Sequence, residues 1–146
     1  MSWPPGAHAS TFGGNPVACA AALVTIRLLR DQFVQNAAEV GEHLMNGLRA
    51  LAGKHAIIGD VRGRGLMIGV ELVRDRVTKE RAIEERNALV QAMFRRGVLI
   101  LGAGRNALRF APPLVLTRSQ ADDVLRLFDE ALGEVGAAQT TASRLY

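Results

Sequence analysis

The sequence is poor in the residues that define several common classes of protein. Its 146 residues include a single cysteine, Cys19, so no internal disulfide can form and a disulfide-stapled secreted domain is excluded. One tryptophan, one tyrosine and five phenylalanines provide few rings for stacking on nucleic-acid bases. The longest apolar run, residues 17–26, is interrupted by Thr25 and is too short to cross a bilayer. We therefore expect a cytoplasmic protein that contacts neither a membrane nor nucleic acid.

Lysine is scarce as well, with only Lys54 and Lys79, so arginine supplies almost all of the basic charge. The net charge is +4, and most arginines alternate with acidic residues, as in the sequence RDR at 74–76. This alternation is typical of a solvated mixed surface and not of a basic stripe that follows phosphates. The three histidines lie far apart in the sequence and only one cysteine is present, so we expect no metal site.

The residues that are present predict one folded domain with a hydrophobic core. Hydrophobic residues make up 49% of the chain, and 146 residues are enough for one domain but hardly for two. Apolar residues recur at helical spacing over residues 16–30, 34–52, 80–96 and 120–135. Shorter apolar stretches predict strands at 66–73, 98–101 and 107–111, after a glycine-spaced turn at 60–65. This order predicts an α+β or open α/β layer, in which a small sheet of about three strands is packed by helices.

Some details of these elements also follow from the sequence. The strand at 66–73 is apolar on both faces, so we expect it in the centre of its sheet. Ser119 is expected to cap the last helix, and Phe94 to point inward from the third. In the first helix we expect a closely packed and largely buried surface, formed by Ala18, Ala21, Ala22, Leu23 and Ile26.

The segment HASTFGGNP, residues 8–16, is the first candidate for a functional site. Its two adjacent glycines permit backbone conformations that other residues avoid. Asn15 followed by Pro16 is a typical helix start, and the free N–H groups and positive dipole end of a helix favour an anion. Thr11 adds a hydroxyl donor. These features together could hold a phosphate, although an ordinary Gly–Gly turn before a capped helix has the same local features.

Arg109 is the second candidate. Strand alternation over residues 107–111 places it on the face opposite its two apolar neighbours. There a guanidinium could form a fork with a substrate carboxylate, or it could be a solvated arginine on a half-exposed strand. The stretch VRGRG at 61–65 offers two more arginines, for which we favour a tight turn over an anion site. Glu71 is expected to be a strand residue paired with an arginine, without a catalytic role.

Three blocks of the sequence, taken in order, resemble the C-terminal part of class III aminotransferases, also called the ornithine or 4-aminobutyrate aminotransferase family. The blocks are HASTFGGNPVACAAAL, GDVRGRGLMIGVELV and LRFAPPLVLT, and the resemblance extends to about Val135. The first block and the stretch ILGAGRNALRFAPPL look closest to 4-aminobutyrate aminotransferases. A group of amino-acid racemases on the same fold is also similar.

The resemblance implies a fold, a cofactor and a reaction. Family members depend on pyridoxal 5'-phosphate (PLP), have the fold type I architecture, and form homodimers with the active site at the subunit interface. The implied reaction moves an amino group from an ω-amino acid, such as 4-aminobutyrate, to a 2-oxo acid. Thr11, with Ser10 and Phe12 beside it, resembles the family's contact to the cofactor phosphate held by the neighbouring subunit. Arg109 resembles the arginine that binds the substrate α-carboxylate.

The resemblance also implies a division of the chain. Residues 1–30 would be the cofactor-phosphate loop and a helix leading from the large domain, residues 31–136 the small C-terminal domain, and residues 137–146 a frayed tail. The family's catalytic lysine, which holds the cofactor as a Schiff base, lies upstream of this loop. Neither Lys54 nor Lys79 matches its position. We therefore expect a C-terminal piece (a truncated product, a fragment or half of a split enzyme) that is inactive alone. A non-catalytic module that binds a partner or an anion is the alternative.

Overall fold

The computed structural model describes residues 3–142, and the side chains of residues 3–137. Its centre is a four-stranded antiparallel sheet in the order β1-β2-β4-β3. The strands are β1 (Ile58–Arg64), β2 (Met67–Leu72), β3 (Leu101–Ala103) and β4 (Ala107–Phe110). The α+β small domain is therefore confirmed, and so is the central position of β2, which pairs with β1 on one side and β4 on the other.

The sheet has one strand more than the sequence predicted, because residues 58–64 form β1 and not only a turn. The turn itself is short, and it centres on Gly65, whose φ is +55°. A Cβ built at Gly63 would lie 2.3 Å from the carbonyl oxygen of Met67 on the facing strand. Gly63 is thus needed because the two strands of this hairpin lie close together at this position. Its presence also made the strand difficult to predict from the sequence.

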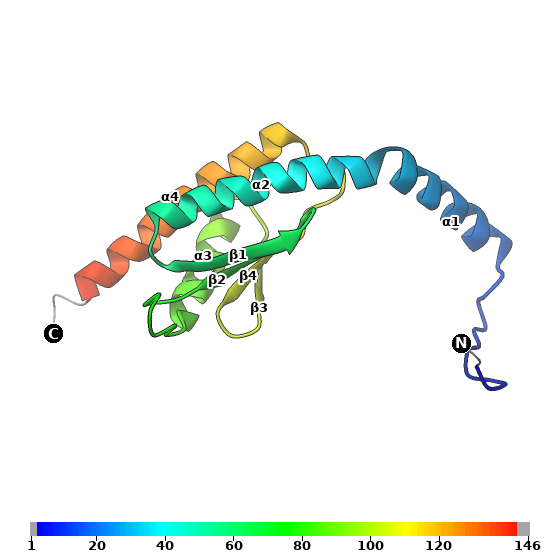
Figure 1. Ribbon diagram of the computed structural model, residues 1–146, viewed down its shortest axis with the longest axis horizontal. Coiled ribbons are helices and arrows are strands. Elements are labelled where there is room, and N and C mark those ends of the chain that lie inside the picture. The colour runs from blue at the N-terminus through cyan, green and yellow to red at the C-terminus, as the bar shows by residue number, and fades with distance from the viewer. Residues whose placement is uncertain (1–2, 143–146) are drawn as a thin grey trace.

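Three helices cover one face of the sheet: α2 (Val34–Lys54), α3 (Ile83–Arg95) and α4 (Arg118–Ala142) (Figure 1). Helix α2 packs on β1, α3 packs on the other three strands, and α4 packs against both of these helices. The rings of Phe110 in β4 and Phe128 in α4 meet edge to face, with centroids 5.3 Å apart. The fully buried large side chains come from the strands and all three helices: Leu44, Leu48, Ile58, Ile68, Val70, Leu72, Val73, Leu89, Met93, Leu108 and Phe128.

The first helix does not join this core. Helix α1 (Pro16–Leu28) runs through a π-helical turn, Leu29–Phe33, directly into α2, and it extends away from the body as an arm (Figure 1). Not one residue of α1 is buried, so the buried surface expected from Ala18 to Ile26 is wrong for the residues that the structure describes. The reason is that α1 packs mainly against the π-helical turn that follows it in the sequence.

The helix ends follow local hydrogen-bonding rules. The Asn15 side chain caps α1 as predicted, accepting from the N–H groups of the second and third helical residues. Helix α4 is capped by Thr117 instead of Ser119: the Thr117 hydroxyl accepts from Gln120 N–H while the Gln120 side chain accepts from Thr117 N–H.

Two further expectations for the helices are corrected. Phe94 in α3 is 61% exposed and does not point inward. Helix α4 continues to Ala142, past the predicted end, and the rest of the predicted tail lies outside the described residues.

Candidate functional site

Arg109 lies on the face of the sheet that no helix covers. In β4 its neighbours Leu108 and Phe110 point into the core, so alternation places Arg109 on the opposite, exposed face. Its partners in register are Gly69 on β2 and Leu101 on β3. Within the described residues the Arg109 guanidinium has no acidic partner and no hydrogen bond. It is therefore available to a carboxylate from outside the domain.

An ion-pair cluster lies beside Arg109 on the same face. Arg62 Nη1 in β1 donates to Asp60 Oδ2 at 2.6 Å and to Glu71 Oε2 at 2.9 Å. The hydrogen bonds to Asp60 and Glu71 raise the pKa of Arg62 above its ordinary value. The other oxygen of Glu71 accepts from Asn106 Nδ2 at 3.4 Å. The expected pairing of Glu71 with an arginine is confirmed. Asp60 and Asn106 were not predicted from the sequence, because residues 60–65 have the glycine spacing of a turn and Asn106 directly precedes its strand.

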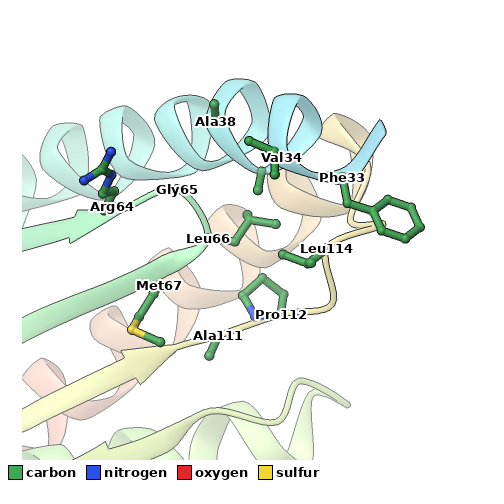
Figure 2. A pocket seen from close by; sticks show the side chains of 11 residues that line it. Phe33, Val34, Ala38, Arg64, Gly65, Leu66, Met67, Ala111, Pro112 and Leu114 are labelled. Atoms are coloured by element: carbon green, nitrogen blue, oxygen red, sulfur yellow. The ribbon is translucent and has the colours of Figure 1, made fainter. Parts of the chain in front are cut away.

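Arg64 takes part in a different feature, an apolar hollow of about 440 Å³ at one end of the sheet. The hollow lies where the start of α2, the β1–β2 turn and the segment after β4 meet, and Figure 2 shows Arg64 at the turn beside α2. Its lining is Phe33, Val34, Ala37, Ala38, Arg64, Gly65, Leu66, Met67, Ala111, Pro112 and Leu114. Neither Arg109 nor Thr11 lines it, so the two predicted binding residues do not meet in this hollow.

The N-terminal loop presents its polar groups to solvent. Ser10, Thr11 and Phe12 are all exposed, and Phe12 is 84% exposed. The Thr11 hydroxyl has no hydrogen-bond partner among the described residues, and the amide N–H groups of residues 11–14 have none either. Gly14 has a φ of +78°, a conformation that side chains disfavour. The loop therefore carries a set of free donors on a backbone turned by glycine.

The free donors lie in the loop and not at the start of α1. The Asn15 Oδ1 atom accepts from Val17 N–H at 3.0 Å and from Ala18 N–H at 3.1 Å, and Cys19 N–H donates to Asn15 O. Since Pro16 has no N–H, the first helical donors are already used or missing. The expectation that the helix start supplies free N–H groups is therefore corrected. An anion held here would depend on the loop amides and Thr11, with only the dipole of α1 behind them.

These residues fit the two anions that the sequence resemblance implies, a cofactor phosphate and a substrate carboxylate. A phosphate needs several N–H or O–H donors, and the loop offers donors that have no partner among the described residues. A substrate carboxylate needs a planar pair of donors, and Arg109 offers an unpaired guanidinium. Figure 1 places the loop beyond the far end of α1, well away from the sheet that carries Arg109. One copy of the chain does not bring the two together.

Neither lysine lies near these groups. Lys54, at the end of α2, donates to Asp129 Oδ2 at 2.6 Å and, with His55, holds the pKa of Asp129 below its usual range. Lys79 lies in the loop between β2 and α3, with its backbone N–H bonded to Asp75 O. Among the described residues no cluster of histidine, cysteine and carboxylate side chains suits a metal ion. No helix in the same part of the chain is long and apolar enough to span a membrane.

Comparisons with known proteins give a consistent picture. Residues 1–132 match the family described as aminotransferase class-III. The chain is 36% identical over 132 residues to an acetylornithine aminotransferase of Caldanaerobacter subterraneus subsp. tengcongensis, covering 90% of this chain and 31% of that protein. It is 39% identical over 135 residues to a leucine/methionine racemase of Thermococcus litoralis, covering 92% of this chain and 30% of that protein.

A solved structure is similar over the same region. An amine transaminase from an uncultivated Pseudomonas species, in its PLP-bound form, superposes with a TM-score of 0.80 at 35% identity. The superposition covers 88% of this chain and 30% of the transaminase. The chain thus spans about 30% of the length of the proteins that it matches.

Proposed function

The chain belongs to the class III aminotransferase family, and from that premise we propose how it serves a PLP-dependent reaction. The family is one of PLP-dependent aminotransferases, and this chain corresponds to their C-terminal portion. We propose that the whole enzyme moves an amino group from an ω-amino acid, of the 4-aminobutyrate type, to a 2-oxo acid. The bound cofactor supplies the electron sink on which such amino-group chemistry depends.

Arg109 carries the proposal. An arginine on an uncovered sheet face, with no ion pair to any acid among the described residues, suits an external carboxylate. Both substrates of the proposed reaction carry one, so the same guanidinium can orient the amino acid and the oxo acid in turn. The Pro112–Pro113 segment that follows β4 ends the strand and keeps Arg109 on a rigid element.

Thr11 and its neighbours Ser10 and Phe12 are proposed to contact the cofactor phosphate. The Thr11 hydroxyl and the loop N–H groups have no partner among the described residues. This supports the binding of an anion that does not belong to this copy of the chain. Because the loop and Arg109 lie apart in one copy, we propose that they serve two different active sites of a homodimer. The same division assigns residues 1–30 to the loop and arm and residues 31–136 to the small domain. Of the predicted tail, 137–146, the part up to Ala142 belongs to α4 instead. The uncovered α1 would then contact the large domain and the partner subunit.

The 146-residue chain is expected not to carry its own cofactor chemistry. Adding pyridoxal phosphate, reducing with borohydride and locating modified lysines by mass spectrometry should yield no stoichiometric, site-specific adduct. Lys54 is held by Asp129 and Lys79 lies in an exposed loop, so neither lies in the apolar pocket that suits a nucleophilic lysine. A single stable adduct at either lysine would overturn the proposal that catalysis needs residues outside this chain.

Replacing Thr11 should weaken cofactor retention. We expect Thr11→Ala, tested in a class III relative whose C-terminal 30% is replaced by this chain, to raise the Kd for PLP by about tenfold. The reason is the loss of one hydrogen bond to a charged phosphate, worth about 1.5 kcal/mol. Thr25→Ala is the matched control, because the Thr25 hydroxyl is satisfied by Ala21 O at 2.9 Å within α1. Equal PLP affinity in the Thr11 variant and the control would argue against the phosphate contact.

Two alternatives have specific support. A racemase of the same fold would use the same cofactor and return the proton to Cα, and the similarity to the Thermococcus litoralis racemase favours it. Assaying the grafted enzyme with a single enantiomer, with and without a 2-oxo acid, separates the two reactions. A non-catalytic module that binds a partner or an anion is supported by the exposed α1. A grafted enzyme that folds and retains PLP but turns over no amino acid would favour the module.

A further inference from the structure

Glu71 occupies a position from which it can reach either of two arginines. In register, Glu71 pairs with Asp60 on β1 and with Ala107 on β4. Arg62 and Arg109 are both partners of Gly69, two residues before Glu71 on β2. Glu71 is therefore the diagonal neighbour of both arginines, and diagonal neighbours lie about 7–8 Å apart, within reach of long side chains.

The glycine between the two arginines keeps the space above β2 open. A Cβ at Gly69 would meet nothing closer than Arg62 O, 3.8 Å away, so no neighbouring side chain fills this position. Without a side chain at Gly69, nothing on β2 separates the Glu71 carboxylate from the Arg109 guanidinium. If the Glu71 carboxylate were free, it could pair with the Arg109 guanidinium and so compete with the carboxylate of a bound acid.

The structure resolves this competition in favour of Arg62. One Glu71 oxygen accepts from Arg62 at 2.9 Å, and the other faces Asn106 Nδ2 at 3.4 Å. Asp60 binds the same Nη1 of Arg62 at 2.6 Å and so keeps Arg62 on the outer edge of the sheet. Asn106 is itself fixed, because its Nδ2 also donates to Leu72 O at 2.7 Å. Both carboxylate oxygens of Glu71 are engaged, and Arg109 has no acidic partner among residues 3–137.

We propose that Arg62 is a positioning residue for Arg109: by holding the Glu71 carboxylate toward β1, it keeps the Arg109 guanidinium free to bind the carboxylate of an amino acid or 2-oxo acid. The inference rests on the proposed function of Arg109. Arg62 would thus affect substrate binding through Glu71, without contacting the substrate itself. It also explains why an acidic residue can stand beside the carboxylate-binding arginine without neutralising it.

The test uses the whole 146-residue chain and glutarate, a dicarboxylate without an amino group, as the probe. Binding is read from the Nε–H resonance of Arg109 in NMR titrations, with neutral glutaramide as the comparison probe. Arg62→Gln should raise the half-saturation concentration of glutarate at Arg109 by about three- to fivefold, the range expected for one exposed ion pair. The double variant R62Q/E71Q should restore the wild-type value, because the competing carboxylate is gone.

Arg64→Gln is the matched control. Arg64 lies two residues further along β1 and carries the same charge, but it has no acidic partner among the described residues. Its loss reports the long-range effect of one positive charge, and it should change the half-saturation concentration less than R62Q does. Equal effects of R62Q and R64Q, or an R62Q effect that E71Q fails to reverse, would overturn the inference alone. A wild-type Arg109 resonance that responds no better to glutarate than to glutaramide would overturn the role of Arg109 and this inference with it.

Discussion

An Arg109→Ala enzyme should need far more amino acid than its parent to reach the same rate. In the grafted class III enzyme we expect kcat/KM to fall about 10- to 100-fold, mainly through KM. A charge-assisted hydrogen bond is worth about 1.5–3 kcal/mol, and tenfold in affinity corresponds to about 1.4 kcal/mol. The Arg109 side chain has no structural partner in the described chain, so its removal should leave the fold intact. Steady-state kinetics with both substrates measure the effect.

The control for this variant is again an unpaired arginine. Arg64→Ala removes one positive charge near the same sheet, but it leaves Arg109 and the ion-pair cluster in place. Its kcat/KM should stay within about twofold of the parent, since exposed charges at a distance are screened by salt. An Arg109 variant with unchanged KM and kcat/KM would refute the carboxylate role. A loss of similar size in both variants would point to a general electrostatic effect.

The second large effect concerns stability. Gly41→Ala should lower the free energy of unfolding by about 2 kcal/mol, because the added methyl group has no room. A Cβ at Gly41 would lie 2.2 Å from the carbonyl carbon of Gly65 and 2.3 Å from its oxygen. These are backbone atoms of the β1–β2 turn, so a rotamer change cannot relieve the clash and α2 must move away from the hairpin. Overpacking of this kind typically costs about 1–3 kcal/mol, partly offset by the better helix propensity of alanine.

The same helix supplies the matched control. Gly53 lies in the last turn of α2, and a Cβ there would meet nothing within 4 Å. Gly53→Ala should therefore leave stability unchanged or raise it by about 0.5–1 kcal/mol, as expected when glycine is replaced in a helix. Urea denaturation of both variants measures the difference. If Gly41→Ala proved as stable as Gly53→Ala, the close contact between α2 and the turn would not be a constraint on the fold.

The sequence predicted those features that depend on local periodicity. Helical spacing identified the four α-helices of the described residues, but not the π-helical turn, Leu29–Phe33, that joins the first two. The alternation around Arg109 placed its side chain on the face opposite its two apolar neighbours. Asn15 was identified as a cap because capping needs only the residues next to it. The three sequence blocks likewise indicated the family that the comparisons show.

Predictions that needed a partner element were less successful. The pattern of small and apolar residues in α1 predicts a buried face, but no segment that the structure describes buries it. Residues 58–64 were not predicted as a strand because glycine is typical of turns. In the structure, Gly63 is the position at which β2 packs closely against this strand. Phe94 has helical spacing with Val90, but its side chain is exposed.

The candidate site divides in the same way. The sequence by itself determined that Arg109 lies on the face opposite its two apolar neighbours, because strand alternation fixes the direction of each residue. Only the tertiary structure decided that Glu71 pairs with Arg62 and leaves Arg109 free. That choice depends on which strands are neighbours and in what register. Strand order and register are set by contacts between segments far apart in the chain, which no local pattern records.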